Sequence, residues 1–363
     1  MHAAPTIMCG PEPGAFPRAI WQENGVTRIE IGIPGEARRG ILSPEAFAVL
    51  KSSAGKADPF LEQALRTGDY AALRAMPPQD QDLTVEPIEE TELLAKGSHG
   101  EIPVTLYRTA GPPGTRPALV YLHGGGFRMG SRRSTVHSMR LLAQYSSAAV
   151  FSVEYRLAPE HRFPCATDDA WNALLWVYRH AAELDVDRAR ILIGGDSAGG
   201  NLAAACARRD RNMRTGILKG QLLVYPVLSQ CESALPGYHF STGDYEICEE
   251  QKQLIQAAVF SLKNTMDRFR LYTKTAAEDH SPDASPLLDG SFSGLPPTWI
   301  FCAEFDSLTQ QAKAYAAQLG AAGGRVCLTV YRGMHHGFMN RLGQYPQAAL
   351  LHREMADVLR RSM

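Results

Sequence analysis

The 363-residue sequence predicts an α/β protein with a mostly parallel central sheet and helices on both of its faces. From residue 118 onward, short apolar runs alternate with helical stretches, as is typical of such a sheet. One strand-to-helix junction carries Gly195-Asp196-Ser197-Ala198-Gly199, a G-x-S-x-G pattern. A serine on such a turn has a strained backbone and an exposed hydroxyl at the positive end of a helix. We therefore expect Ser197 to be a nucleophile; the alternative is a Gly/Ser-rich loop that matches the pattern by chance.

Composition and charge exclude several classes of function. The formal net charge of −1 gives no electrostatic reason to expect a nucleic acid or an anionic membrane as partner. No stretch has the length of a membrane span, and the N-terminus lacks the pattern of a signal peptide. The seven cysteines are scattered without metal-ligand spacing. We therefore expect reduced thiols, a cytoplasmic location, no metal and no cofactor.

The N-terminal region precedes the first clear strand pattern. Residues 1–40 are rich in Pro and Gly and are predicted to be largely irregular, with one short extended piece from Val26 to Ile31. A helix is expected from Ser43, the N-cap, with Pro44 at its first position. A second helical stretch runs from Asp58 to Met76. We assign residues 1–80 to an N-terminal cap segment; simple packing against the core is the alternative.

The catalytic domain is expected over residues 81–363. Alternating apolar residues between Leu83 and Arg108 predict an antiparallel strand pair at one edge of the sheet. The further strands are predicted near 118–122, 148–154, 190–194, 221–225, 298–303 and 326–331. The helices are predicted near 134–146, 166–183, 200–209, 308–322 and 345–361.

A long connection separates the strand at Leu222 from the strand at Thr298. Its length of about seventy residues exceeds a normal connection several-fold. A helical run from Gln251 to Leu262 indicates that this insertion is ordered. We predict a cap insertion at about residues 230–282, which covers the active site together with the N-terminal segment.

A glycine loop follows the first core strand as His123-Gly124-Gly125-Gly126-Phe127. Successive glycines leave backbone N–H groups unobstructed, and one such donor to an oxyanion contributes about 3 kcal/mol to transition-state stabilisation. Ala198, directly after the serine, supplies another N–H. His123 is expected to hold the loop by hydrogen bonds rather than to transfer protons.

Two later strands end in candidates for an acid and a base. Glu304 and Asp306 follow one strand, and we choose Asp306 because it lies further into the loop. The last strand leads to His335 and His336, only one of which can face the serine. Gly337 allows a tight turn directly after His336, which favours His336 as general base.

With these elements in place, residues 80 to 360 resemble the hormone-sensitive-lipase-like branch of the α/β-hydrolases. The resemblance rests on HGGGF at 123–127, YRLAPEHRFP at 155–164, GDSAGG at 195–200, SPLL at 285–288, AEFD at 303–306 and HGF at 336–338. It implies Ser197 as nucleophile, Asp306 as orienting acid and His336 as base, with the N–H groups of Gly125, Gly126 and Ala198 as the oxyanion hole. It also implies a capped serine carboxylesterase that needs no cofactor and acts on short- to medium-chain esters.

Two local features and two alternatives accompany this resemblance. The acid motif continues as Ser307-Leu308, where relatives have a proline. We therefore expect other residues to hold the loop that carries Asp306 in place. Arg156 and Glu160 are expected to pair and fix a turn. The alternatives are an amidase or acyltransferase with the same triad and, from another class, a non-catalytic ligand-binding receptor. The expected partner is a small-molecule ester, and a homodimer is left open.

Overall fold

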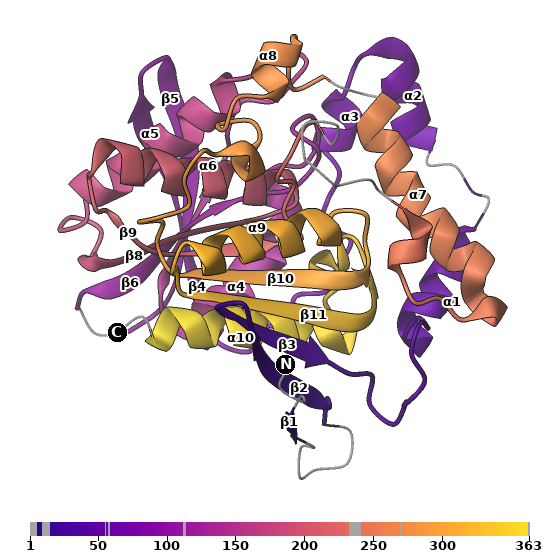
Figure 1. Cartoon of the computed structure of the whole chain (residues 1–363). Helices are drawn as coiled ribbons and strands as arrows, with labels where there is room; N and C mark the ends of the chain where they lie inside the picture. The colour runs from indigo at the N-terminus through magenta and orange to yellow at the C-terminus, as the bar shows by residue number, and fades with distance from the viewer. Residues whose placement is uncertain are drawn as a thin grey trace.

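The computed structural model describes residues 6–8, 15–54, 56, 59–111, 114–231, 241–268 and 271–361. In these residues, eleven strands form one sheet in the order β1-β2-β3-β11-β10-β9-β8-β6-β7-β5-β4 (Figure 1). The strands are β1 (Thr6–Met8), β2 (Arg18–Glu23), β3 (Val26–Ile31), β4 (Ile88–Gly97), β5 (Gly100–Thr109), β6 (Arg116–Leu122), β7 (Ala149–Val153), β8 (Val186–Asp196), β9 (Leu218–Val224), β10 (Thr298–Phe305) and β11 (Val326–His335).

The centre of the sheet is parallel, from β3 through β11, β10, β9, β8 and β6 to β7. Antiparallel pairs flank it, with β4 and β5 beside β7 at one edge and β1 and β2 beside β3 at the other. The predicted α/β fold, the six core strands and the antiparallel pair are confirmed. Their apolar runs are buried on both faces because helices cover both sides of the sheet.

Helices lie on both faces of the sheet and beside it (Figure 1). They are α1 (Pro44–Ser53), α2 (Pro59–Thr67), α3 (Ala71–Arg74), α4 (Val136–Ser146), α5 (Cys165–Arg179), α6 (Ala198–Met213), α7 (Lys252–Arg268), α8 (Ala276–Asp279), α9 (Thr309–Ala321) and α10 (Pro346–Arg361). Helices α5, α6 and α9 bury their apolar sides against one face, and α4 and α10 against the other. The five predicted core helices are confirmed.

The predicted extended piece from Val26 to Ile31 is confirmed as β3, but the prediction that the rest of residues 1–40 is largely irregular is wrong for Arg18–Glu23, which form β2. Strands β2 and β3 form a hairpin, and β3 pairs in parallel with β11 from Val26 to Ile31. The turn is Asn24-Gly25, and both residues have positive φ, +50° and +79°. Such Asn-Gly turns match the twist of antiparallel strands. Because Val26 and Ile31 are fully buried, this segment is part of the core sheet.

Segments far apart in sequence meet beside the sheet. Helix α7 packs against the N-terminal helix α1 (Figure 1). The amide N of Leu42 donates to Oε1 of Gln251 at 2.8 Å, and the amide N of Cys248 donates to the carbonyl O of Gly40 at 2.8 Å. Of the predicted cap segments, residues 1–5, 9–14, 55, 57, 58, 232–240 and 269–270 lie outside the described residues.

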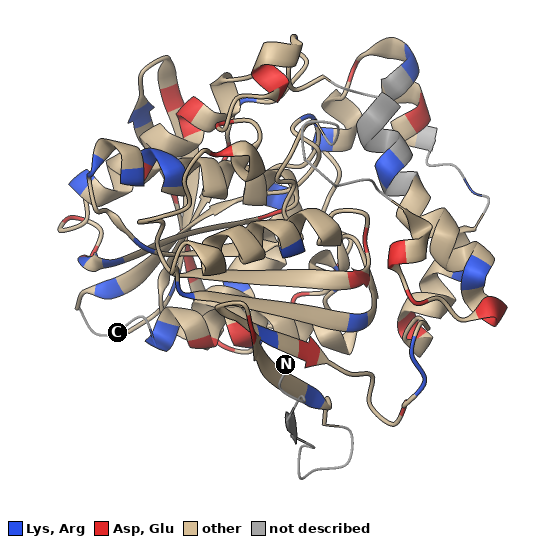
Figure 2. Ribbon diagram, viewed as in Figure 1, with Lys and Arg blue, Asp and Glu red and all other residues tan. Residues whose placement is uncertain are grey.

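Charged residues are spread over the molecule. Figure 2 shows basic and acidic residues interspersed along the helices and strands, as the net charge of −1 suggests. Within the described ranges, no helix is long and apolar enough to cross a membrane.

Candidate active site

Ser197 occupies a sharp turn between β8 and α6. Its backbone has φ 54° and ψ −114°, a conformation that L-residues with side chains rarely adopt. Glycines make this turn possible on either side. A Cβ on Gly199 would lie 1.8 Å from the carbonyl O of Leu122, and one on Gly195 would lie 2.4 Å from the backbone C of Gly199. The G-x-S-x-G pattern is therefore required by the close approach of the backbone segments.

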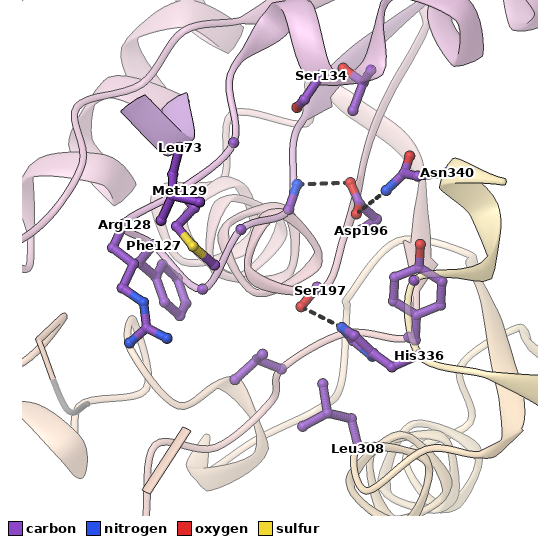
Figure 3. Close-up of a pocket in the computed structure, with 18 of the residues that line it drawn as sticks. Leu73, Phe127, Arg128, Met129, Ser134, Asp196, Ser197, Leu308, His336 and Asn340 are labelled. Atoms are coloured by element: carbon purple, nitrogen blue, oxygen red, sulfur yellow. Dashed lines mark hydrogen bonds between the residues drawn. The ribbon is translucent and has the colours of Figure 1, made fainter. Parts of the chain in front are cut away.

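Three predicted residues form a continuous hydrogen-bonded chain. Nε2 of His336 lies 3.1 Å from Oγ of Ser197, a hydrogen bond drawn as a dashed line in Figure 3. Nδ1 of His336 lies 2.7 Å from Oδ2 of Asp306. Because the Asp306 carboxylate can only accept, Nδ1 carries the proton and Nε2 is free to accept from the serine hydroxyl. The geometry is that of a nucleophile, a base and an orienting acid.

The acid loop is held by its own backbone and by the insertion. Oδ1 of Asp306 accepts from the amide N of Leu308 at 2.9 Å. Its carbonyl O accepts from the amide N of Thr309 at 3.0 Å and from the hydroxyl of Tyr245 at 2.8 Å. These bonds support Asp306 where relatives have a proline. Sequence reasoning did not find this role of Tyr245, because it lies 61 residues away in sequence.

The other acid of the motif, Glu304, turns to a different neighbour. Its Oε2 accepts from the amide N of Gly333 at 2.7 Å. Burial raises the pKa of Glu304 to about 7. Glu304 lines a separate cavity together with residues of β2, β3 and β11, so the structure brings Asp306 and not Glu304 against His336.

The neighbouring histidine also points elsewhere. Nε2 of His335 lies 2.9 Å from the hydroxyl O of Tyr345, and Nδ1 lies 2.8 Å from the carbonyl O of His336. Burial lowers the pKa of His335 to about 4, so its ring is neutral at physiological pH. His335 supports the loop that carries His336.

The glycine loop is fixed by Asp196 and His123. Oδ1 of Asp196 accepts from the amide N of Gly124 at 2.8 Å and from the hydroxyl of Tyr121 at 2.9 Å. Nδ1 of His123 bonds to the carbonyl O of Gly124 at 2.7 Å, and the Tyr155 ring stacks on the imidazole with centroids 4.3 Å apart. His123 is fully buried, and burial lowers its pKa. It holds the loop, as predicted.

The next two glycines form a tight turn beside the serine. Gly125 has φ +127°, and a Cβ there would lie 2.0 Å from the carbonyl O of Met129. That position therefore accepts only glycine. Within the described part of the chain, no protein hydrogen bond engages the N–H groups of Gly125, Gly126 or Ala198. These donors are available to a bound oxyanion.

The predicted pairing of Arg156 with Glu160 is wrong. Arg156 instead pairs with the buried Asp169, with Nε 2.8 Å from Oδ2. Glu160 pairs with Arg74 of α3, with Nη2 2.8 Å from Oε2. Nε of Arg74 also donates to the carbonyl O of Arg128, directly behind the glycine loop, at 2.9 Å. No local sequence pattern marks Arg74, because this ion pair joins residues 86 positions apart.

A cavity of about 650 Å³ lies over Ser197 and His336. Its wall includes Leu73 and Pro77 from the N-terminal segment and Tyr272 from the insertion. Tyr272 stacks on Phe127, with ring centroids 3.7 Å apart. Both extra segments therefore shape the space in front of the serine. Among the described residues, no three His, Cys, Asp or Glu side chains form a group that could hold a metal ion.

Comparison with known proteins supports one family. A family model described as alpha/beta hydrolase fold matches residues 119–340. The chain is 37% identical over 256 residues to carboxylesterase NlhH of Mycobacterium tuberculosis, covering 69% of this chain and 75% of that protein. It is 35% identical over 269 residues to ethyl acetate hydrolase of Pseudomonas putida, covering 72% and 78%. A solved hyperthermophilic esterase from Pyrobaculum calidifontis superposes with a TM-score of 0.69 at 31% identity, covering 88% of this chain and 98% of that one.

Proposed function

Because this chain belongs to the hormone-sensitive-lipase-like branch of the α/β-hydrolase family and is a carboxylic ester hydrolase, we propose that it cleaves short- to medium-chain esters through an acyl-enzyme on Ser197. The observation that carries this proposal is the hydrogen-bonded chain from Asp306 through His336 to Ser197. The same chain of bonds provides the two functions that an ester hydrolase needs, a nucleophile and a proton carrier.

In the first step, Oγ of Ser197 attacks the ester carbonyl carbon while Nε2 of His336 takes the hydroxyl proton. Asp306 accepts the hydrogen bond from Nδ1 and stabilises the imidazolium that forms. The carbonyl oxygen becomes an oxyanion, which the N–H groups of Gly125, Gly126 and Ala198 bind. Each such donor contributes about 3 kcal/mol to transition-state stabilisation.

In the second step, the tetrahedral intermediate collapses and the C–O bond to the alcohol breaks. The leaving alkoxide takes the proton from Nε2 of His336, and the acyl group stays on Ser197. A water molecule then attacks the acyl-enzyme, and His336 removes its proton. Collapse of the second intermediate releases the carboxylic acid and returns the proton to Ser197.

We further propose that residues 1–80 and about 230–282 together form the cap over residues of the 81–363 domain. The contacts of Leu42 with Gln251 and of Cys248 with Gly40 support this, because they join the two segments. The cap contribution of the first segment comes from α1, α2 and α3, since β2 and β3 belong to the sheet. Acyl-chain preference then depends on cap side chains such as Leu73.

The test is a panel of p-nitrophenyl esters from acetate to palmitate, assayed with the purified full chain and with the Ser197→Ala variant. We expect turnover that is highest for the short and medium acyl chains and is lost in Ser197→Ala. Anilide substrates in the same panel test for amidase activity. An added acyl acceptor tests for acyltransferase activity. Undiminished ester turnover by folded Ser197→Ala would overturn the proposed mechanism.

A cytoplasmic location is also proposed. The six cysteines in the described residues form no disulfide, which supports a reducing environment. A homodimer stays a prediction, which light scattering of the purified protein tests.

A further inference from the structure

The glycine loop beside Ser197 leads into an aromatic residue with a strained backbone. Gly125, Gly126 and Phe127 follow one another with φ of +127°, +61° and +62°. Glycine adopts such angles readily, but a bulky side chain does so at a cost in free energy, because its Cβ comes too close to the following carbonyl oxygen. A residue keeps such a conformation only where its surroundings fix it. The contacts of Phe127 therefore help to hold the N–H groups of the two preceding glycines in place.

Tyr272 of the insertion makes such a contact. Its ring lies parallel to the ring of Phe127, with centroids 3.7 Å apart and 7° between the two planes, and both side chains are buried. In Figure 3 the Phe127 ring lies on one side of Ser197, and His336 lies on the other. Because protein interiors are close-packed, a parallel neighbour limits how far the Phe127 ring can shift or tilt. The stack therefore fixes the residue at which the glycine loop ends.

Tyr272 is itself held by the core of the catalytic domain. Its hydroxyl forms a hydrogen bond of 2.8 Å with the hydroxyl of Thr167, which is fully buried on α5. Its carbonyl O accepts from the amide N of Phe163 at 2.8 Å, and the Phe163 ring packs edge-on against it with centroids 5.7 Å apart. Because the hydroxyl is bonded to Thr167, Tyr272 presents only its ring to the glycine loop.

We propose that Tyr272 is a positioning residue for the oxyanion hole, which it keeps in shape by stacking on Phe127. This inference rests on the proposed function, because the oxyanion belongs to the proposed acyl transfer. Donors stabilise a transition state most when they already point to the place where the negative charge develops. The stack holds the N–H groups of Gly125 and Gly126 in that arrangement before a substrate binds. The insertion then contributes to turnover itself, besides shaping the cavity.

The first experiment removes either the ring or only its hydroxyl in the full chain. Tyr272→Leu loses the stack, and we expect kcat for p-nitrophenyl esters to fall on the order of 10- to 100-fold, somewhat less than deletion of an oxyanion donor costs. The fall should be equal for every acyl chain length, since each ester passes through the same oxyanion. Tyr272→Phe keeps the ring and should rescue kcat to within about threefold, the scale of one neutral hydrogen bond.

A second measurement separates positioning from shaping of the cavity, which Tyr272 also lines. When hexyl trifluoromethyl ketone adds to Oγ of Ser197, the hydroxyl proton passes to His336 and the carbonyl oxygen becomes an oxyanion. The alcohol formed by reduction of this ketone has nearly the same shape but cannot form the oxyanion. Tyr272→Leu should weaken inhibition by the ketone as much as it lowers kcat and leave inhibition by the alcohol unchanged. Equal weakening of both inhibitors would overturn the inference.

Two further variants test whether the effect passes through Phe127. Phe127→Gly removes the ring and accepts positive φ without strain, so Tyr272→Leu should have little further effect in that background. An undiminished further effect would contradict the proposed route. Phe260→Leu is the matched control, because it removes an aromatic ring from α7 of the same insertion that does not line the cavity. It should leave kcat unchanged.

Circular dichroism of each variant identifies one that fails to fold. If Tyr272→Leu does not fold, Tyr272→Met takes its place, because its flexible side chain fills the space without a ring. A folded variant that lacks the ring and keeps full kcat would overturn the inference and leave the esterase proposal intact. An unmodified enzyme that hydrolyses no ester counts against the proposed function instead.

Discussion

The floor and the roof of the active site are assembled in different ways. On the floor, Ser197, Asp306 and His336 follow β8, β10 and β11, and the parallel register of these strands brings their carboxyl ends to one edge of the sheet. The roof combines helices α1 to α3 with α7. Its two parts meet through side-chain and loop contacts such as the pair of Arg39 with Glu246, which are 207 positions apart.

This difference separates chemistry from selectivity. The sheet fixes the reacting groups within hydrogen-bond distance, so loss of one of them cannot be compensated by a neighbour. The roof forms the wall of the cavity by contacts that are partly exposed and individually weak. We therefore expect floor variants to lose turnover and roof variants to change which ester is turned over. The predictions below test that division, from the largest expected effect to the smallest.

The largest effect is expected for the base on the floor. His336→Ala should lower kcat by about 10⁴-fold or more, as loss of a triad member does in other serine hydrolases. His335→Ala, which removes the contact with Tyr345, should cost far less. Steady-state kinetics on both variants measures the difference. An inactive, folded His335→Ala beside an active His336→Ala would reverse the assignment.

The next effect concerns the part of the N-terminal segment that belongs to the sheet. Deletion of residues 1–40 removes β2 and β3 and exposes the edge of β11. Loss of the buried Val26 and Ile31 alone should cost about 3 kcal/mol or more of unfolding free energy. A cap segment outside the sheet could be deleted with a larger effect on substrate preference than on stability, but the pairing of β3 with β11 predicts the reverse. Urea unfolding of the truncated and the full chain measures this loss of stability. Equal unfolding free energies would show that the hairpin is dispensable.

The ionisation of Glu304, which lies outside the group of reacting residues, predicts how the stability of the protein depends on pH. Its pKa of about 7 in the folded protein lies above the ordinary value of 4.5, so the folded state binds its proton more tightly than the unfolded chain does. The associated stability is complete below pH 4.5 and is lost as the pH rises through about 7. Glu304→Gln keeps an acceptor for Gly333 but cannot ionise. Its unfolding free energy relative to the unmodified protein should therefore rise between pH 5 and pH 8, by up to about 3 kcal/mol.

The control for this measurement is Glu62→Gln, which makes the same change at an exposed site on α2. Urea unfolding at the two pH values should show no such trend in the control. If the unfolding free energies of Glu304→Gln and the unmodified protein differ by the same amount at both pH values, protonation of the buried Glu304 does not stabilise the fold.

The smallest effect is expected where roof and floor touch. Arg74→Met removes the bonds from α3 to the carbonyl oxygens of Arg128 and Ala158 and to Glu160. Because these bonds position the loop and do not touch the reacting atoms, we expect a loss in kcat/KM on the order of tenfold. The loss should vary along the ester panel. Arg66→Met, at an exposed position on α2, is the matched control. An equal loss of kcat/KM for every ester would show that Arg74 supports turnover, as the floor residues do, and not ester selectivity.

Sequence patterns predicted the core of the sheet because its strands are continuous apolar runs that alternate with helices. They also indicated Ser197, Asp306 and His336, since each follows a strand. Glycines adjoin the Ser197 and His336 motifs, whereas Asp306 was chosen over Glu304 because it lies further into the loop. The extended piece that forms β3 was predicted, but its partner β2 was missed although Asn24-Gly25 is a strong turn signal, because the surrounding Pro and Gly content suggested irregular structure.

The contacts that could not be predicted are long-range and made by side chains. Arg74 and Tyr245 carry no local signal, and their partners become neighbours only when the N-terminal segment and the insertion pack beside the sheet. The pairing of Arg156 with Glu160 was inferred from closeness in sequence. The buried carboxylate of Asp169 instead provides Arg156 with a bidentate partner in three dimensions.

Covalent labelling tests most directly whether Ser197 is the nucleophile on the floor. A fluorophosphonate should inactivate the full chain, and mass spectrometry of the digest should find one adduct, on Ser197. The adduct should form far more slowly in His336→Ala, because the hydroxyl then lacks its base. Complete inactivation with the adduct on another residue, or equally fast labelling without His336, would contradict the assignment.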